Sequence, residues 1–204
     1  MTEPTANAML TPQQGQILVR LARQQIEQHL GVKPDRPVTA EELEAAAFHR
    51  RQGVFVTLHK QRDLRGCIGS LAAVESIVDG IKRNALNAAF HDYRFKPLTA
   101  GELSALHVEV SVLTDPKPLG YEDADHLLRL LHPGRDGVIL KGPRGESATF
   151  LPQVWQQLPA PEQFLGHLCR KAGLADGAWR SGTFEILIYQ VQSFEETRPG
   201  GKEL

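Results

Sequence analysis

Two short stretches, GVFVTLH (residues 53–59) and LRGCIGSL (residues 64–71), decide which fold the sequence predicts. Each is rich in strand-forming residues, and the polar residues 60–63 between them are typical of a turn, so the pair predicts a β-hairpin. Glycine weakens a strand interior, so Gly66 and Gly69 on either side of Cys67 indicate a bulge or a close approach of another backbone. The hairpin therefore predicts an antiparallel sheet with an unusual feature around Cys67.

Helical and strand-like segments alternate on both sides of this hairpin. Residues 11–30 follow the 3.6-residue helical period after Thr11, a suitable N-cap, and residues 106–113 alternate between apolar and polar side chains as in a half-buried strand. Residues 184–194 are apolar on both faces and predict one last, central strand. Hairpins interleaved with helices predict an α+β fold with a mainly antiparallel sheet flanked by helices.

Composition narrows the class of protein. A chain of 204 residues suits one domain, or one domain with a subsidiary lobe, and a net charge of -1 does not favour nucleic acid or an anionic membrane as a partner. No apolar run approaches the roughly 20 residues of a membrane helix, and MTEPTANAML lacks the features of a secretory signal. The two cysteines, Cys67 and Cys169, form no disulfide framework. We expect a cytoplasmic protein.

The residues around Cys67 are of types that can make its thiol reactive. Residues two apart share a face of a strand, so Arg65, Cys67 and Gly69 are predicted to point one way and Leu64 and Ile68 toward the core. A guanidinium beside a thiol favours the reactive thiolate, which would make Cys67 nucleophilic, redox-active or ligand-binding. The alternative is a small structural cysteine, since free cysteine is among the most buried residue types.

Glu109 is the best candidate partner for either interpretation. It lies in mid-strand on the polar face of residues 106–113, where a carboxylate needs a partner. We predict that it faces Arg65 across the sheet, or that it acts as a general base beside Cys67. His107 shares that face, but two side chains are fewer than the three protein ligands that a zinc site needs.

The hairpin also carries a local excess of positive charge. Five cations stand against Asp63 alone between residues 50 and 65, which leaves +4 over this segment: Arg50, Arg51, Lys60, Arg62 and Arg65. Such a patch would attract an anionic ligand, although a solvated turn with charges balanced elsewhere on the surface is the alternative.

Four ordered segments carry a resemblance to a known family. LRGCIGSL preceded by GVFVTL, DYRFKPLT (92–99), VEVSVL (108–113) and FLPQVWQQLPAPEQFLGHLCRKAGL (150–174) resemble the AMMECR domain family. The last segment is similar to its bacterial branch, called AmmeMemoRadiSam system protein A. The resemblance covers residues 13–196, and we expect residues 1–12 and 197–204 to be mobile tails.

The resemblance implies two unequal lobes, and a Memo-type protein and a radical SAM protein as functional partners. It implies no settled activity, and any cofactor is unknown. Two hypotheses remain. In the first, the chain is an enzyme or enzyme component for a small anionic or oxidisable substrate. Its catalytic candidates are Cys67, Glu109 and Arg65, and its ligand-binding candidates are Gly66, Gly69 and Ser70. In the second, it is a non-catalytic binding or scaffold protein in which Cys67 is structural.

Overall fold

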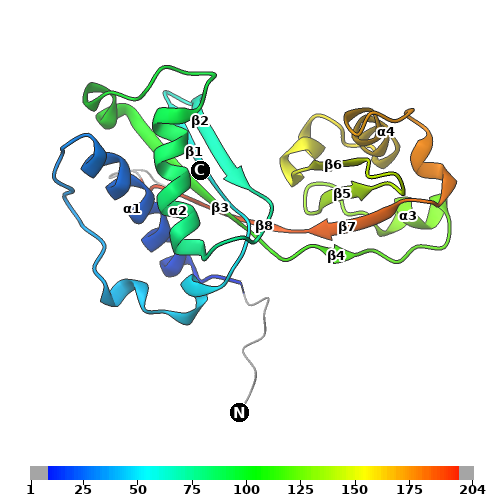
Figure 1. Cartoon of the computed structure of the whole chain (residues 1–204), viewed down its shortest axis with the longest axis horizontal. Coiled ribbons are helices and arrows are strands. Elements are labelled where there is room, and N and C mark those ends of the chain that lie inside the picture. Colours follow the sequence, from blue (N-terminus) through cyan, green and yellow to red (C-terminus); the bar gives the residue numbers. More distant parts are fainter. Residues whose placement is uncertain (1–8, 198–204) are drawn as a thin grey trace, which may run out of the picture. The chain divides into compact units, whose positions relative to one another are not determined.

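The computed structural model describes residues 9–197, which form two compact units of unequal size (Figure 1). The first contains residues 9–113 and 192–197, and the second contains residues 114–191. Both have antiparallel sheets flanked by helices, so the predicted α+β class is confirmed. Within residues 9–197, no helix is both long enough and apolar enough to cross a membrane.

The first unit is built on a four-stranded sheet in the order β2-β1-β3-β8. Its strands are β1 (Val54–Lys60), β2 (Asp63–Ser70), β3 (Leu106–Leu113) and β8 (Val191–Glu195). Its helices are α1 (Pro12–His29), η1 (Glu41–Leu43), η2 (Ala46–His49), α2 (Ile77–Leu86), the π-helix η3 (Asn87–His91) and η4 (Ala100–Ala105). The helices α1 and α2 cover one face of the sheet (Figure 1).

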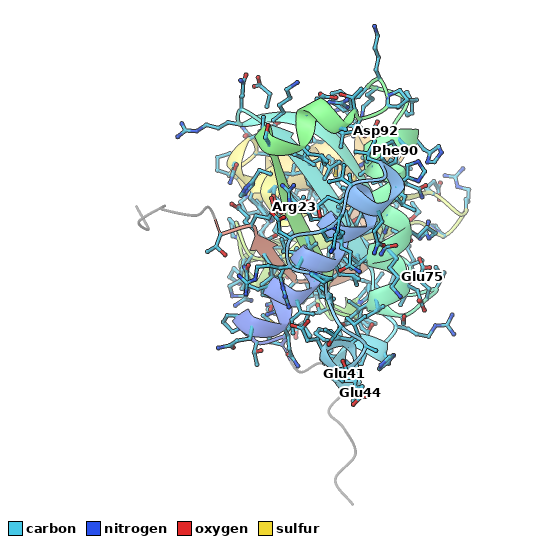
Figure 2. All side chains as sticks on the ribbon, turned by 90° about the vertical axis from the view of Figure 1, so that its left-hand side faces the viewer. Arg23, Glu41, Glu44, Glu75, Phe90 and Asp92 are labelled. Atoms are coloured by element: carbon cyan, nitrogen blue, oxygen red, sulfur yellow. The ribbon has the colours of Figure 1, made fainter. Side chains whose placement is uncertain are left out.

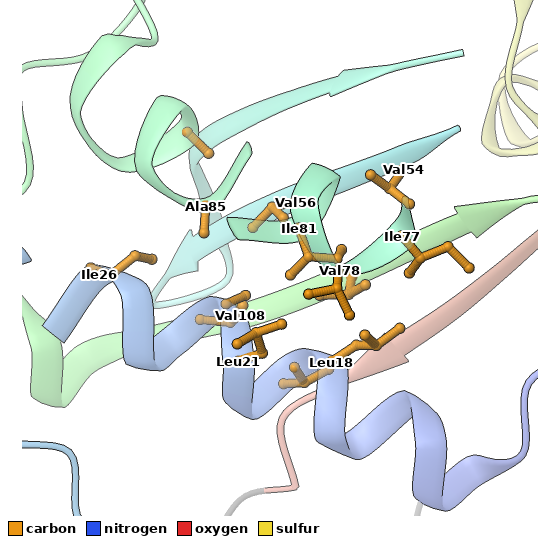
Figure 3. Packing of buried hydrophobic residues seen from close by; sticks show 14 of the residues in the cluster. Leu18, Leu21, Ile26, Val54, Val56, Ile77, Val78, Ile81, Ala85 and Val108 are labelled. Atoms are coloured by element: carbon orange, nitrogen blue, oxygen red, sulfur yellow. The ribbon is translucent and has the colours of Figure 1, made fainter. Parts of the chain in front are cut away.

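Local sequence explains the start of α1 and its buried face. Thr11 and Gln14 form a capping box that satisfies the first free amide groups of the helix, as predicted for this N-cap. Leu18 and Leu21 then point into the core, where α2 and the strands meet them (Figure 3). The alternating residues of β1 and β3 that face the helices are also buried: Val54, Val56, Leu58, Val108, Val110 and Val112.

The second unit has a four-stranded sheet in the order β4-β7-β5-β6. Its strands are β4 (Lys117–Pro118), β5 (Gly137–Lys141), β6 (Ser147–Phe150) and β7 (Glu185–Tyr189). Its helices are α3 (Ala124–Leu130), η5 (Pro152–Gln156), α4 (Pro161–Lys171) and η6 (Ala178–Ser181). Trp155 stacks on Phe164 with ring centroids 3.7 Å apart, and Leu165 and Cys169 are fully buried in the same core.

The prediction of a single strand over residues 184–194 is wrong. This stretch forms β7 and β8, which belong to different sheets and are separated at Gln190. Thr114 fixes the break, since Gln190 N donates to Thr114 Oγ1 at 2.8 Å and Thr114 N donates to Gln190 O at 2.9 Å. The run of strand-forming residues continues through the break, so no pattern in it marks the change of sheet. In its own sheet, β7 is central, as predicted for this stretch.

The predicted terminal tails lie mostly outside the described residues. Within the N-terminal segment 1–12, Leu10 is buried, and its backbone N–H and C=O both bond the side chain of Gln192. The first unit thus ties residues close to its N-terminus onto the strand that completes its sheet.

Candidate functional site

A β-bulge at Arg65 shapes the hairpin. Leu58 pairs with Gly66, but the next residue of β1, His59, pairs with Leu64, so Arg65 has no direct partner on β1. The glycines around Cys67 indicated such an irregularity. On one side of the bulge, each residue of β2 therefore faces the opposite side of the sheet from the one that simple alternation predicts.

The bulge explains where Leu64 and Ile68 lie. Leu64 was predicted to face the core, but its exposed fraction is 41%, so that prediction is wrong. Ile68, beyond the bulge, packs against the core as predicted. A single inserted residue reverses the facing of every residue on one side of it, which explains why Leu64 differs from the prediction and Ile68 does not.

Both glycines of the motif sit where a side chain would collide with its surroundings. A Cβ on Gly66 would lie 2.2 Å from the carbonyl oxygen of Ala88 in η3, and a Cβ on Gly69 would lie 2.2 Å from the ring of Phe55. Ser70 closes the end of β2 by exchanging two hydrogen bonds with Ala72. The space beside Gly66 and Gly69, predicted to serve a ligand, is occupied by these neighbours.

The loop after η3 holds the backbone of Cys67 at the free edge of β2. Cys67 N donates to Asp92 Oδ2 at 2.9 Å, and Cys67 O accepts from Arg94 Nη2 at 3.2 Å. Asp92, labelled in Figure 2, is buried and bonds Arg94 through both carboxylate oxygens. The Arg94 guanidinium, helped by the Cys67 N–H, holds the pKa of Asp92 well below its usual range. Two segments that carried the family resemblance, LRGCIGSL and DYRFKPLT, therefore form one unit of structure.

The predicted pairing of Arg65 with Glu109 is wrong, because Arg65 pairs with Glu102 of η4. Arg65 Nε lies 3.1 Å from Glu102 Oε1, Arg65 Nη2 lies 3.2 Å from Glu102 Oε2, and Nη2 also donates to the carbonyl of Lys96. Lys60 Nζ contacts the same carboxylate at 3.0 Å. The hydrogen bond from Arg65 is the main cause that lowers the pKa of Glu102 from 4.5 to about 2. Two of the five cations of the basic patch are therefore held by one partly buried carboxylate.

Glu109 instead belongs to a polar cluster on the face of the sheet that α1 and α2 leave uncovered. Its Oε2 lies 3.6 Å from His59 Nε2, and its Oε1 accepts a hydrogen bond from Ser111 Oγ at 3.4 Å. On this face Thr57 is directly opposite both Glu109 and Cys67, because β1 lies between β3 and β2. Cys67 Sγ is 3.3 Å from Thr57 Oγ1, and Cys67 is partly exposed.

His107 shares the face with Glu109, as the alternation predicted, but its partner is Glu195, 3.3 Å from its Nε2. Among residues 9–197, no three His, Cys, Asp or Glu side chains are placed to hold a metal ion. The sequence analysis missed Thr57, His59 and Glu102 as members of the site. Thr57 and His59 could be found only from the strand register. Glu102 stands three residues after Thr99, a spacing typical of the capping box that the two form at the start of η4.

Comparison with known proteins shows the family to which this chain belongs. A model of the AMMECR1 family matches residues 19–194, nearly the whole described chain. The chain belongs to the AMMECR1 family. A protein of Thermofilum pendens is 37% identical over 94% of both chains, and a protein of Methanopyrus kandleri is 38% identical over 94% of this chain and 93% of its own.

A solved structure of the same fold supports the assignment to the AMMECR1 family. The crystal structure of an uncharacterized protein from Pyrococcus horikoshii superposes with a TM-score of 0.74 and is 33% identical. The match covers 95% of this chain and 96% of that chain. These three similar proteins come from archaea.

Proposed function

We propose that this AMMECR1-family protein is an enzyme or enzyme component that uses the Cys67 thiol on a small anionic or oxidisable substrate. The observation that carries the proposal is the position of this thiol. It is partly exposed, lies 3.3 Å from the Thr57 hydroxyl and shares a sheet face with Glu109 and His59. A thiol among hydroxyl, carboxylate and imidazole groups has the neighbours that thiol-dependent catalysis requires.

Rigid positioning of Cys67 supports the same proposal. Both backbone polar groups of Cys67 are bonded, to Asp92 and to Arg94, so the thiol is held on a fixed segment of an edge strand. Arg94 is partly exposed next to Cys67, where its cation can attract an anionic substrate. Arg65 serves this site indirectly, by fixing the bulge through Glu102.

We also propose that the chain belongs to a particular branch of the family. Membership of the bacterial branch, AmmeMemoRadiSam system protein A, would give the chain a Memo-type protein and a radical SAM protein as partners. Two free cysteines favour a reducing, cytoplasmic location. Co-purification of the tagged chain with either partner, lost in a control with an unrelated tagged protein, would support the partnership.

The reactivity of Cys67 tests the proposal directly. We expect iodoacetamide to modify Cys67 of the folded protein quickly near neutral pH, with mass spectrometry of peptides identifying the site. Cys169 is the internal control, because it is fully buried and burial raises the pKa of its thiol. Inertness of both cysteines until the protein unfolds would overturn the proposal.

The alternative is a non-catalytic binding or scaffold protein. It is favoured by the packing around Gly66 and Gly69, which gives both motif glycines a structural reason. Metabolite profiles of a deletion strain separate the two functions. If wild-type protein restores the profile and Cys67→Ser does not, the enzyme is supported; full restoration by Cys67→Ser at equal protein level supports the binding protein.

A further inference from the structure

We infer that Thr57 is a positioning residue that connects the Cys67 thiol with Glu109 and His59, so that three neighbouring strands provide one proton path. This inference rests on the proposed function of Cys67. It adds two residues, Thr57 and His59, that neither the family match nor the sequence motifs assign.

The register of the sheet makes Thr57 the centre of the arrangement. β1 is bonded to β2 on one side and β3 on the other, and Thr57 is opposite Cys67 on the first and opposite Glu109 on the second. Side chains directly opposite each other in antiparallel strands have Cβ atoms about 4.5–5.5 Å apart, which is within reach of a hydroxyl and a carboxylate. The Glu109 carboxylate contacts Ser111 and His59 in this structure, so it must rotate to accept the proton of Thr57. The contact of Thr57 Oγ1 with Cys67 Sγ, at 3.3 Å, completes the first step.

His59 lies at the far end of this path. It follows Thr57 by two residues on β1, so the two side chains share a face, and its Nε2 is 3.6 Å from Glu109 Oε2. His59 and Glu109 are both mostly enclosed, with exposed side-chain fractions of 29% and 18%. The Glu109 carboxylate lies where it can orient the His59 ring, as the third group does in catalytic triads.

The other charged groups around Cys67 are already paired. Arg94 is bonded to Asp92 through two contacts, and Arg65 is bonded to Glu102 through two contacts. His107 lies on β3 directly opposite His59 and contacts Glu195. Among the described residues, the His59–Glu109 pair is therefore the proton acceptor that the register places next to Thr57.

The proton transfer from Cys67 to His59 needs no reactant besides these side chains. The S–H bond of Cys67 breaks and its proton passes to Thr57 Oγ1, while the Thr57 hydroxyl proton passes to Glu109. Glu109 then gives this proton to His59 Nε2, so that the net change is a thiolate and an imidazolium. The restored Thr57 hydroxyl donates a hydrogen bond to the thiolate, which keeps it in place for its substrate.

Two substitutions of Thr57 test the inference with iodoacetamide as the probe and the full chain as the sample. Thr57→Val keeps the shape and the strand preference but removes the hydroxyl, and Thr57→Ser keeps the hydroxyl. Loss of a hydrogen bond to a charged group should slow alkylation of Cys67 near pH 7 about tenfold in Thr57→Val. Thr57→Ser should restore the rate to near that of the wild type.

Glu109→Gln tests the step between Thr57 and His59, and it provides a second readout if Thr57→Val fails to fold. It should alter the shape of the pH profile of alkylation, because it removes the carboxylate that links Thr57 with His59. Glu185→Gln is the matched control, because Glu185 is also a glutamate on a strand but pairs with Lys141 in the second unit. This control should leave the profile unchanged.

The outcomes separate this inference from the proposed function. Cys67 that is inert in the wild type at every pH overturns the proposed function. Rapid alkylation that is equal in the wild type and in Thr57→Val overturns the proton path but leaves the proposed function standing. Equal slowing in Thr57→Val and Thr57→Ser also overturns it, since that result indicates a packing effect.

Discussion

Asp92 holds the main chain of Cys67 in place: its Oδ2 accepts a hydrogen bond of 2.9 Å from the Cys67 amide at the edge of the sheet. An unpaired edge strand offers its N–H and C=O groups to any other strand that approaches. Asp92 and its partner Arg94 occupy these groups at Cys67, and so they both protect the edge and fix the thiol. The stability of the fold and the geometry of the site thus depend on one carboxylate.

Replacement of Asp92 by alanine should destabilise the protein strongly. It leaves the Cys67 N–H without its acceptor and Arg94 without its counter-charge, so we expect the free energy of unfolding to fall by about 3 kcal/mol. Urea denaturation measures this change. Glu75→Gln is the control, because it removes a surface ion pair with Arg83 that is worth less than about 1 kcal/mol. A similar small effect for both variants would contradict the role of Asp92.

The two motif positions that hold glycine should not tolerate alanine. Gly66→Ala places a methyl group against the backbone oxygen of Ala88, and a backbone atom cannot rotate away. We expect a loss of about 3 kcal/mol from this overpacking, measured as the free energy of unfolding in urea. Gly101→Ala is the matched control, since no atom lies within 4 Å of its added Cβ. If Gly66→Ala unfolds at the same urea concentration as Gly101→Ala, the close contact with η3 is absent.

The Arg65–Glu102 pair should give the protein a characteristic acid sensitivity. The pKa of Glu102 in the folded protein, about 2, lies below its ordinary value of 4.5, so the unfolded chain binds the proton more tightly. The stabilisation by this pair is therefore complete above about pH 4.5 and is lost as the pH falls toward 2. Glu102→Gln should lower the free energy of unfolding by about 2 kcal/mol at neutral pH, and its difference from the wild type should shrink below pH 4. A difference that stays constant from neutral pH to pH 2 would show that the charge of Glu102 contributes nothing.

Local patterns in the sequence predicted much of the fold but little of the pairing within the site. The hairpin, the N-cap at Thr11 and the alternation of β3 follow from neighbouring residues, and the structure contains all three. The partner of Arg65 depends instead on the bulge, which moves one side chain toward η4 and so toward Glu102 rather than Glu109. No periodicity reveals which residue of a glycine-containing strand will bulge.

For the same reason, only part of the polar cluster on the uncovered face could be predicted from the sequence. Cys67 and Glu109 were recognised because each is unusual in a strand, whereas Thr57 is a common strand residue and His59 lies next to a turn. Their importance comes from the order of strands, β2-β1-β3, which places β1 between the two recognised residues. Strand order is a long-range property, and it is not encoded in any one segment.

The turn between β1 and β2 offers a last test, because it is made from residues poorly suited to it. Gln61 and Arg62 both have positive φ, 54° and 75°, in a two-residue connection that normally favours Asn followed by Gly. The double variant Gln61→Asn, Arg62→Gly should therefore raise the free energy of unfolding by about 1 kcal/mol, since each original side chain is strained in this conformation. Arg62→Lys is the control: it keeps the charge and the strain and should give no gain. If the control and the double variant are equally stable, the turn is not strained. If the double variant gains stability but alkylation of Cys67 slows, the strained turn contributes to the position of the bulge and the thiol.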